Sequence, residues 1–69
     1  MVFVIYTEES QGDLERGTSS TYELAVLYAK MVYDLDPRDE PHVFINEEDT
    51  DGCLLREKVW DSAEWEVEA

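Results

Sequence analysis

Ser20–Leu35, with the sequence STYELAVLYAKMVYDL, is the segment that decides the fold, because it is the only stretch long and apolar enough to form a helix that closes a core. Ser20 followed by Glu23 matches a capping box, which predicts where the helix begins. At helical spacing one broad apolar face is expected to lie on the core. That face consists of Leu24, Leu27, Tyr28, Met31, Val32 and Leu35.

The same helix carries a second apolar row on its flank, formed by Tyr22, Val26, Ala29 and Tyr33. One small sheet offers too little surface to cover both rows. We therefore expect this flank to be exposed and available to a protein partner.

Length and charge limit the possible functions. Sixty-nine residues make one domain, and a domain of this size buries only about 60% of the surface of its unfolded chain, so a large substrate cleft is not expected. Eighteen acidic residues against five basic ones give a net charge of −13. This charge favours cationic partners and disfavours direct binding to nucleic acid or to an anionic membrane, since both need basic patches.

Two features indicate a cytoplasmic protein. Cys53 is the only cysteine, so no internal disulfide is possible, as is typical of a reducing compartment. The apolar run 2–6 lacks a basic flank and is short, which predicts a strand and not a signal peptide.

The predicted strands lie on both sides of the helix. Val2–Thr7 is apolar on both alternations, which predicts a central strand. The segment 8–19 is expected to be a loop, with brief pairing of 14–16 to the first strand as the alternative. After the helix, which ends at 36–37, residues 42–46 are expected to form a second strand and 53–60 a third, joined by a hairpin turn.

The C-terminal segment allows two interpretations. Residues 64–68 alternate acid with apolar side chains, which predicts a fourth strand with Leu55, Val59, Trp65 and Val67 on the core face. That register would set Lys58 opposite Glu66 and Arg56 opposite Glu68. The alternative is a short helix, because 61–64 also resembles a capping box.

These elements predict the α+β class: a small antiparallel sheet of three to four strands with one helix packed on a face, in the order β-α-β-β-β.

No segment carries a catalytic or metal-binding motif. The stretch 47–52 has carboxylates at positions one, three and five of an EF-hand loop and Gly52 at position six, but position twelve is Lys58 and the flanking segments are strands. A hairpin turn with glycine at positive φ is favoured. His42 and Cys53 have no third group to form a nucleophilic or zinc site. We therefore expect neither enzymatic activity nor a cofactor nor a bound metal.

The acidic residues form two groups in the sequence. The first lies within 34–51 and comprises Asp34, Asp36, Asp39, Glu40, Glu47, Glu48, Asp49 and Asp51, with Arg38 as the only cation among them. Asp34 and Asp36 also sit at the helix C-terminus, where the macrodipole disfavours carboxylates, and such local inconsistency often reflects function. The second group is Glu64, Glu66 and Glu68, which would project from a strand at intervals of roughly 6.5–7 Å.

In size, acidity and compact α+β organisation the chain resembles the small acidic phage-type proteins that imitate DNA, anti-CRISPR proteins among them. The resemblance implies that the two acidic groups occupy a Lys/Arg-rich site of a basic nucleic-acid-binding protein or complex in a bacterial host cell and keep DNA out. The alternative is a small interaction or assembly module, possibly homodimeric, that uses the Tyr22/Val26/Tyr33 flank.

Overall fold

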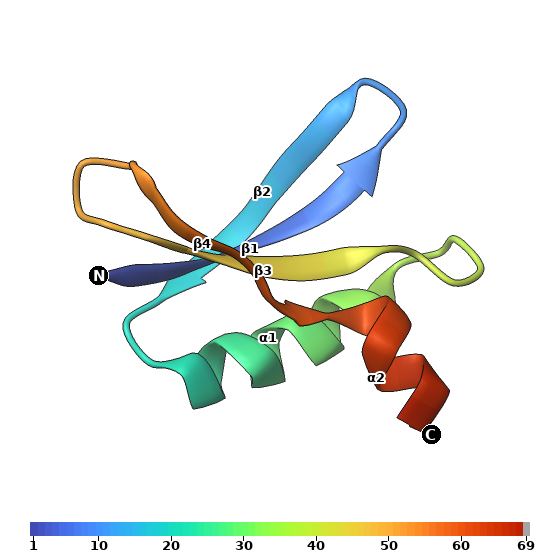
Figure 1. The fold of residues 1–69 in the computed structure, drawn as a ribbon. Coiled ribbons are helices and arrows are strands. Elements are labelled where there is room, and N and C mark those ends of the chain that lie inside the picture. The colour runs from blue at the N-terminus through green and yellow to red at the C-terminus, as the bar shows by residue number, and fades with distance from the viewer. Residues whose placement is uncertain (69) are drawn as a thin grey trace.

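The computed structural model describes residues 1–68 and has the element order β-β-α-β-β-α. The strands are β1 (Val2–Glu9), β2 (Gly12–Ser19), β3 (Val43–Glu48) and β4 (Leu54–Asp61), and the helices are α1 (Tyr22–Leu35) and α2 (Ser62–Glu68). The strands form one antiparallel sheet in the order β2-β1-β3-β4 (Figure 1). The predicted fold class and the central position of β1 are confirmed.

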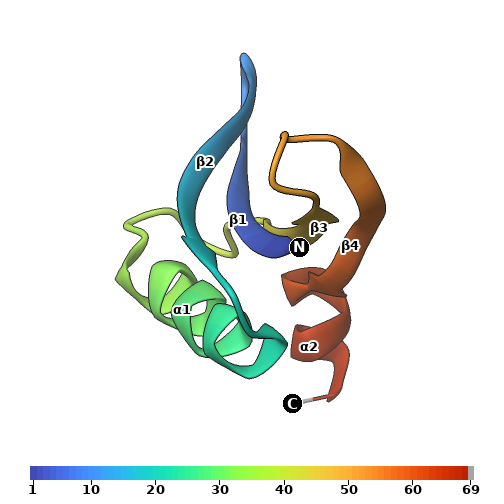
Figure 2. The same ribbon diagram turned by 90° about the vertical axis from the view of Figure 1, so that its left-hand side faces the viewer.

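Two segments differ from the expected topology. The segment expected to be a loop contains β2, which pairs with β1 over its full length, so the alternative pairing was right in kind but too short. The expected C-terminal strand is the helix α2, and the alternative of a short helix is confirmed. The predicted pairs of Lys58 with Glu66 and of Arg56 with Glu68 therefore do not form. Figures 1 and 2 show α2 beside α1 on the same side of the sheet.

The start of α2 is fixed to the sheet by a buried serine. The Ser62 hydroxyl accepts a hydrogen bond from the Val43 backbone N–H at 3.0 Å and lies 3.4 Å from the Pro41 carbonyl. Ser62 is 1% exposed, so these bonds satisfy polar groups that would otherwise be buried without partners. They hold the chain at the point where it turns sharply from β4 into α2 and does not continue as a strand.

The helix α1 packs on the sheet through the side that was expected to be exposed. Ala25 and Ala29 are fully buried against Phe3, Ile5 and neighbouring strand residues, with Val26, Val32 and Tyr33 packed around them. The physical reason is size: the strands supply large side chains, and two alanines let the helix axis approach them closely. Of the face expected in the core, Val32 packs against the core cluster and Tyr28 contacts the edge strand β2, whereas Leu24, Leu27, Met31 and Leu35 are exposed.

The N-cap of α1 also lies one residue later than predicted. Thr21 has an extended backbone, and its hydroxyl accepts a hydrogen bond from the Leu24 N–H at 3.4 Å. Ser20 therefore does not form the expected capping box with Glu23.

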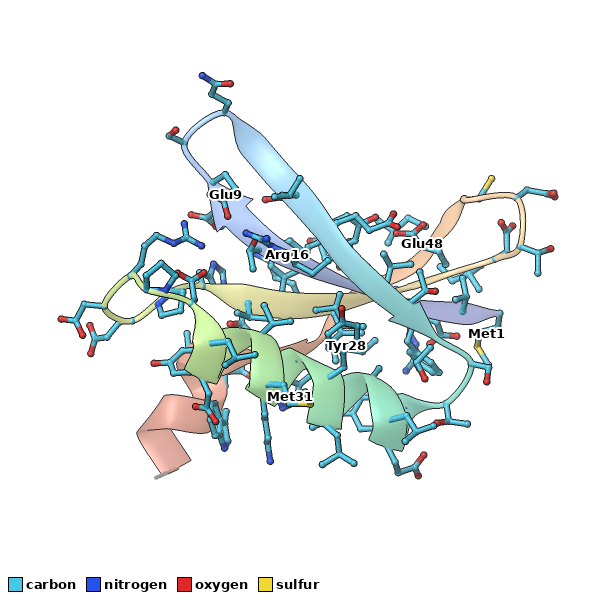
Figure 3. All side chains as sticks on the ribbon, turned by 180° about the vertical axis from the view of Figure 1, so that it is seen from behind. Met1, Glu9, Arg16, Tyr28, Met31 and Glu48 are labelled. Carbon is cyan, nitrogen blue, oxygen red and sulfur yellow. The ribbon has the colours of Figure 1, made fainter. Side chains whose placement is uncertain are left out.

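Tyr28 connects α1 to the edge strand β2. Its hydroxyl donates to the Arg16 carbonyl at 2.9 Å, and Figure 3 shows both labelled residues on the side where α1 meets β2. The Tyr28 ring covers the backbone of Gly17. A Cβ atom at position 17 would lie 2.2 Å from the ring carbon Cε2, so a side chain there would displace the tyrosine.

We therefore expect Gly17→Ala to destabilise the fold by about 1–3 kcal/mol, the usual cost of overpacking. Urea unfolding monitored by tryptophan fluorescence measures this cost. In the Tyr28→Ala background the same substitution should cost much less, since the clash is gone. An equal cost in both backgrounds would contradict the contact.

Candidate acidic interface

The sheet face opposite α1 is the surface on which strand carboxylates gather. Antiparallel register places Glu15 beside Tyr6 and Asp13 beside Glu8 on this face, and pairs Glu48 with Val2. We call this surface, with the carboxylates of Glu8, Asp13, Glu15 and Glu48, the open face. In Figures 1 and 2 no helix covers it.

An aromatic pair lies at the centre of the open face. The rings of Tyr6 and Phe44 stack with centroids 5.5 Å apart, and the Lys58 ammonium lies 5.3 Å from the Phe44 centroid. The Tyr6 hydroxyl donates to a Glu48 carboxylate oxygen at 2.6 Å. Burial, the bond to Glu48 and the nearby negative charges raise the pKa of Tyr6 to about 12, so the phenol stays neutral and keeps donating.

His42 lies at one end of the open face between two carboxylates. Its Nδ1 is 2.9 Å from Glu8 Oε2 and its Nε2 is 2.8 Å from Asp61 Oδ1. The same Asp61 oxygen accepts the Ala63 N–H at 3.0 Å, so the histidine also connects the sheet to the first turn of α2. Burial alone would lower the pKa of His42, but hydrogen bonds and charge from Glu8 and Asp61 outweigh it and raise the pKa.

This arrangement predicts a pH dependence of stability. A histidine whose pKa is higher in the folded state contributes stability that is complete below its unfolded pKa of about 6.5 and is lost as the pH rises through the folded pKa. The urea midpoint of the protein should therefore fall over this window, and the His42→Gln variant should show a smaller fall. Identical pH profiles for the two proteins would contradict a charged His42 in the folded state.

All five basic side chains are engaged within the chain. Arg16 and Arg38 both reach the Glu9 carboxylate, at 3.3 and 3.0 Å, and Arg38 also binds Asp36 at 2.8 Å. Arg56 is paired with Glu47. The two lysines, Lys30 and Lys58, lie over the rings of Trp65 and Phe44.

These ion pairs help to lower the pKa values of two carboxyl groups, Asp36 and Glu9. Hydrogen bonds from Arg38 lower the pKa of Asp36 to about 2. The bond from Thr7, aided by Arg38 and Arg16, lowers the pKa of Glu9. Both groups are ionised at neutral pH, and their charge is already compensated.

The sequence group 34–51 does not form one surface. Asp34, Asp39 and Glu40 lie near the C-terminal end of α1, whereas Asp49 and Asp51 lie in the β3–β4 turn, and the six residues of β3 separate the two ends by about 20 Å (Figure 1). Of the other members, Asp36 is paired with Arg38, Glu47 is buried beside Arg56, and only Glu48 belongs to the open face.

The other expected site features also change in the structure. The row Glu64, Glu66 and Glu68 lies on a helix, so it forms no straight line of strand carboxylates. Glu64 is exposed, and the side chains of Glu66, Val67 and Glu68 lie outside the described part.

In the turn between β3 and β4, the Asp49 carboxylate accepts the N–H groups of Asp51 and Cys53, each at 2.9 Å, and Gly52 has φ +86°. This confirms the hairpin-turn interpretation. Among the described residues no group of three or more His, Cys, Asp or Glu side chains is placed to hold a metal ion.

The flank expected to bind a partner is used by the core. Ala29 is fully buried, and Val26 and Tyr33 pack against the core cluster; Tyr22 alone is markedly exposed, and its ring meets Phe3 edge-on with centroids 5.8 Å apart. Tyr22 and Val26 also line a hollow of about 650 Å³ together with residues of β4 and α2, so this flank is used in part by the core and in part stays accessible.

Sequence reasoning missed Glu8, Asp13, Glu15 and Asp61 as neighbours on one face. The available signal was Gly12 following Ser10-Gln11, which marks a hairpin. In a hairpin with its turn at this position, side chains of the second strand alternate between the two faces of the sheet, and Asp13 and Glu15 both lie on the face of Tyr6.

Comparison with protein-family models, with curated proteins and with solved structures found no match. Over residues 1–68, no helix is long and apolar enough to cross a membrane.

Proposed function

We propose that this protein is an acidic inhibitor that imitates nucleic acid and occupies a Lys/Arg-rich DNA-binding site of a bacterial defence or DNA-handling protein. The observation that carries the proposal is the engagement of all five basic side chains by partners in the same chain. The surface offered to a partner therefore carries a large excess of negative charge, in which Arg56 and Lys58 are exposed positive groups.

The open face is the part of the surface best suited to this role. Its carboxylates stand on neighbouring strands that are about 4.8 Å apart, with about 6.5–7 Å between alternate residues of one strand. This is a spread array that many separate cations can meet, as they meet phosphates, and not a set of ligands converging on one point. The exposed acids Asp39, Glu40 and Asp51 extend the negative surface at the two ends.

The proposed mechanism is competition without catalysis, cofactor or metal. A channel built for phosphates carries several cations, and carboxylates that meet them add affinity and accelerate association. The setting would be the cytoplasm of the bacterial host cell.

The experiment is a two-step capture. Immobilised protein is incubated with bacterial lysate at low salt, and the proteins released by a salt step are identified and purified. Each one is then tested for binding to labelled duplex DNA, with and without the acidic protein. Loss of DNA binding that is overcome by raising the concentration of the labelled duplex is the expected result; a target that binds DNA equally well in both conditions contradicts the proposal.

A further inference from the structure

The outward side of α1 is apolar along its whole length. We call it the outer stripe; it consists of Leu24, Leu27, Tyr28, Met31 and Leu35, which are 39% to 78% exposed. Positions 24, 28, 31 and 35 follow the alternating spacing of four and three residues that is typical of a helix–helix seam. A helix that is apolar on both sides is typical of a buried middle layer, yet here only one side is covered.

Charge favours a second copy as the occupant. No member of the outer stripe is charged, although the chain carries a net charge of −13. A basic partner would gain nothing along such a seam, whereas two acidic copies can approach each other only where neither presents a carboxylate.

The shape of the surface favours the same arrangement. A hollow of about 350 Å³ adjoins the C-terminal half of the stripe; its lining is mostly apolar, includes one ionic residue of each sign, and consists of Arg16, Tyr28, Met31, Val32, Leu35, Asp36 and Pro37. The N-terminal half instead presents Leu24 and Leu27, which are 57% and 59% exposed. A twofold axis across α1 places Leu24 of each copy beside Leu35 and the hollow of the other, which is the reciprocal contact of an isologous interface.

We propose that two copies of this chain pair through their outer stripes, with the α1 helices antiparallel, to form four layers in the order sheet, helix, helix, sheet. The stripe exposes on the order of 600 Å² per copy, somewhat below the roughly 800 Å² per partner of a standard interface, so the dimer should be reversible. The pair leaves both open faces on the outside, so the inference is independent of the proposed inhibitory function.

Sedimentation equilibrium tests this proposal. The experiment is run from 1 to 500 μM protein with a reducing agent, because Cys53 is exposed, and in about 0.3 M salt, which screens the repulsion between copies. The weight-average mass should rise from 8.0 kDa toward twice that value. A constant 8.0 kDa across this range would overturn the proposal.

A matched pair of variants locates the interface. Leu27→Lys with Met31→Lys should keep the mass at 8.0 kDa at every concentration, even though the two added positive charges weaken the repulsion. Ser10→Lys with Thr18→Lys adds the same charge at exposed positions away from α1 and should dimerise at least as well as the parent protein. Dimers of the stripe variant would overturn the proposal. Circular dichroism is used to check that each variant is folded.

Crosslinking tests the antiparallel orientation. In a Cys53→Ser background, Leu24→Cys and Leu35→Cys proteins are mixed and oxidised. The antiparallel pair predicts that the disulfide joins position 24 of one copy to position 35 of the other. Predominant 24-to-24 and 35-to-35 products would instead indicate parallel helices and overturn the arrangement.

Discussion

Replacing Ile45 with alanine is expected to leave a large fraction of the protein unfolded at 25 °C. Ile45 is 0% exposed at the centre of the sheet and belongs to the cluster of Phe3, Ile5, Ala25, Ala29 and Val43. Truncating a buried isoleucine costs about 2–5 kcal/mol, because the removed methyl groups lose their burial and a cavity remains. A core of this size rarely supplies more than about 3–5 kcal/mol of net stability, so the loss is comparable to the whole.

The matched control is Leu24→Ala, which removes a similar apolar volume from α1. Leu24 is 57% exposed, so at low micromolar concentration the free energy of unfolding should change by less than about 0.5 kcal/mol. Urea unfolding followed by circular dichroism measures both variants. Similar losses for Ile45→Ala and Leu24→Ala would mean that α1 presents the other face to the sheet.

Neutralising three open-face carboxylates is the second change with a large expected effect. The triple variant Asp13→Asn, Glu15→Gln, Glu48→Gln keeps the shape of each side chain, and the Tyr6 hydroxyl retains a hydrogen-bond acceptor at position 48. If each carboxylate meets a cation of the target in a charge-assisted hydrogen bond, the loss is about 1 kcal/mol or more per contact, or roughly 100-fold in the dissociation constant for the three.

The control triple is Glu23→Gln, Asp34→Asn, Glu64→Gln, which removes the same three negative charges at exposed positions on α1 and α2. Its affinity for the captured target should fall by less than about tenfold. The dissociation constant is measured at several salt concentrations, and the slope of log Kd against log salt should flatten for the open-face triple alone. Equal losses for the two triples would show that net charge, and not the open face, determines binding.

The sequence predicted the sheet, the central strand and the existence of α1, because these depend on long apolar periodicities. It did not predict which side of α1 meets the sheet. Both sides are apolar, and the choice depends on the fit of Ala25 and Ala29 against large strand residues, which hydrophobicity alone does not reveal. The full length of β2 was missed because Gly12–Ser19 is polar and mostly exposed, so no apolar alternation marks it; the strand is defined by its backbone pairing with β1.

The candidate site was predictable in kind but not in place. Acidity and the scarcity of cations are properties of the sequence, whereas the distribution of the carboxylates depends on topology. Asp36 and Glu47 look as free as Asp39 and Glu48 in the sequence, yet the first two are paired with arginines. The alternation that suggested a row of carboxylates from Glu64 onward is overridden by the turn at Ser62, which starts a helix.

Irregularities in β2 and β4, the edge strands of the sheet, have a further consequence. Arg16 is an extra residue in the register of β2 with β1, and Lys58 interrupts β4 with a φ of +51°. A continuous ladder is what a newly arriving strand needs, and bulges and charged side chains at an edge remove it. Neither edge strand therefore offers an uninterrupted ladder for the addition of another strand, and we expect partners to contact this protein mainly through its side chains.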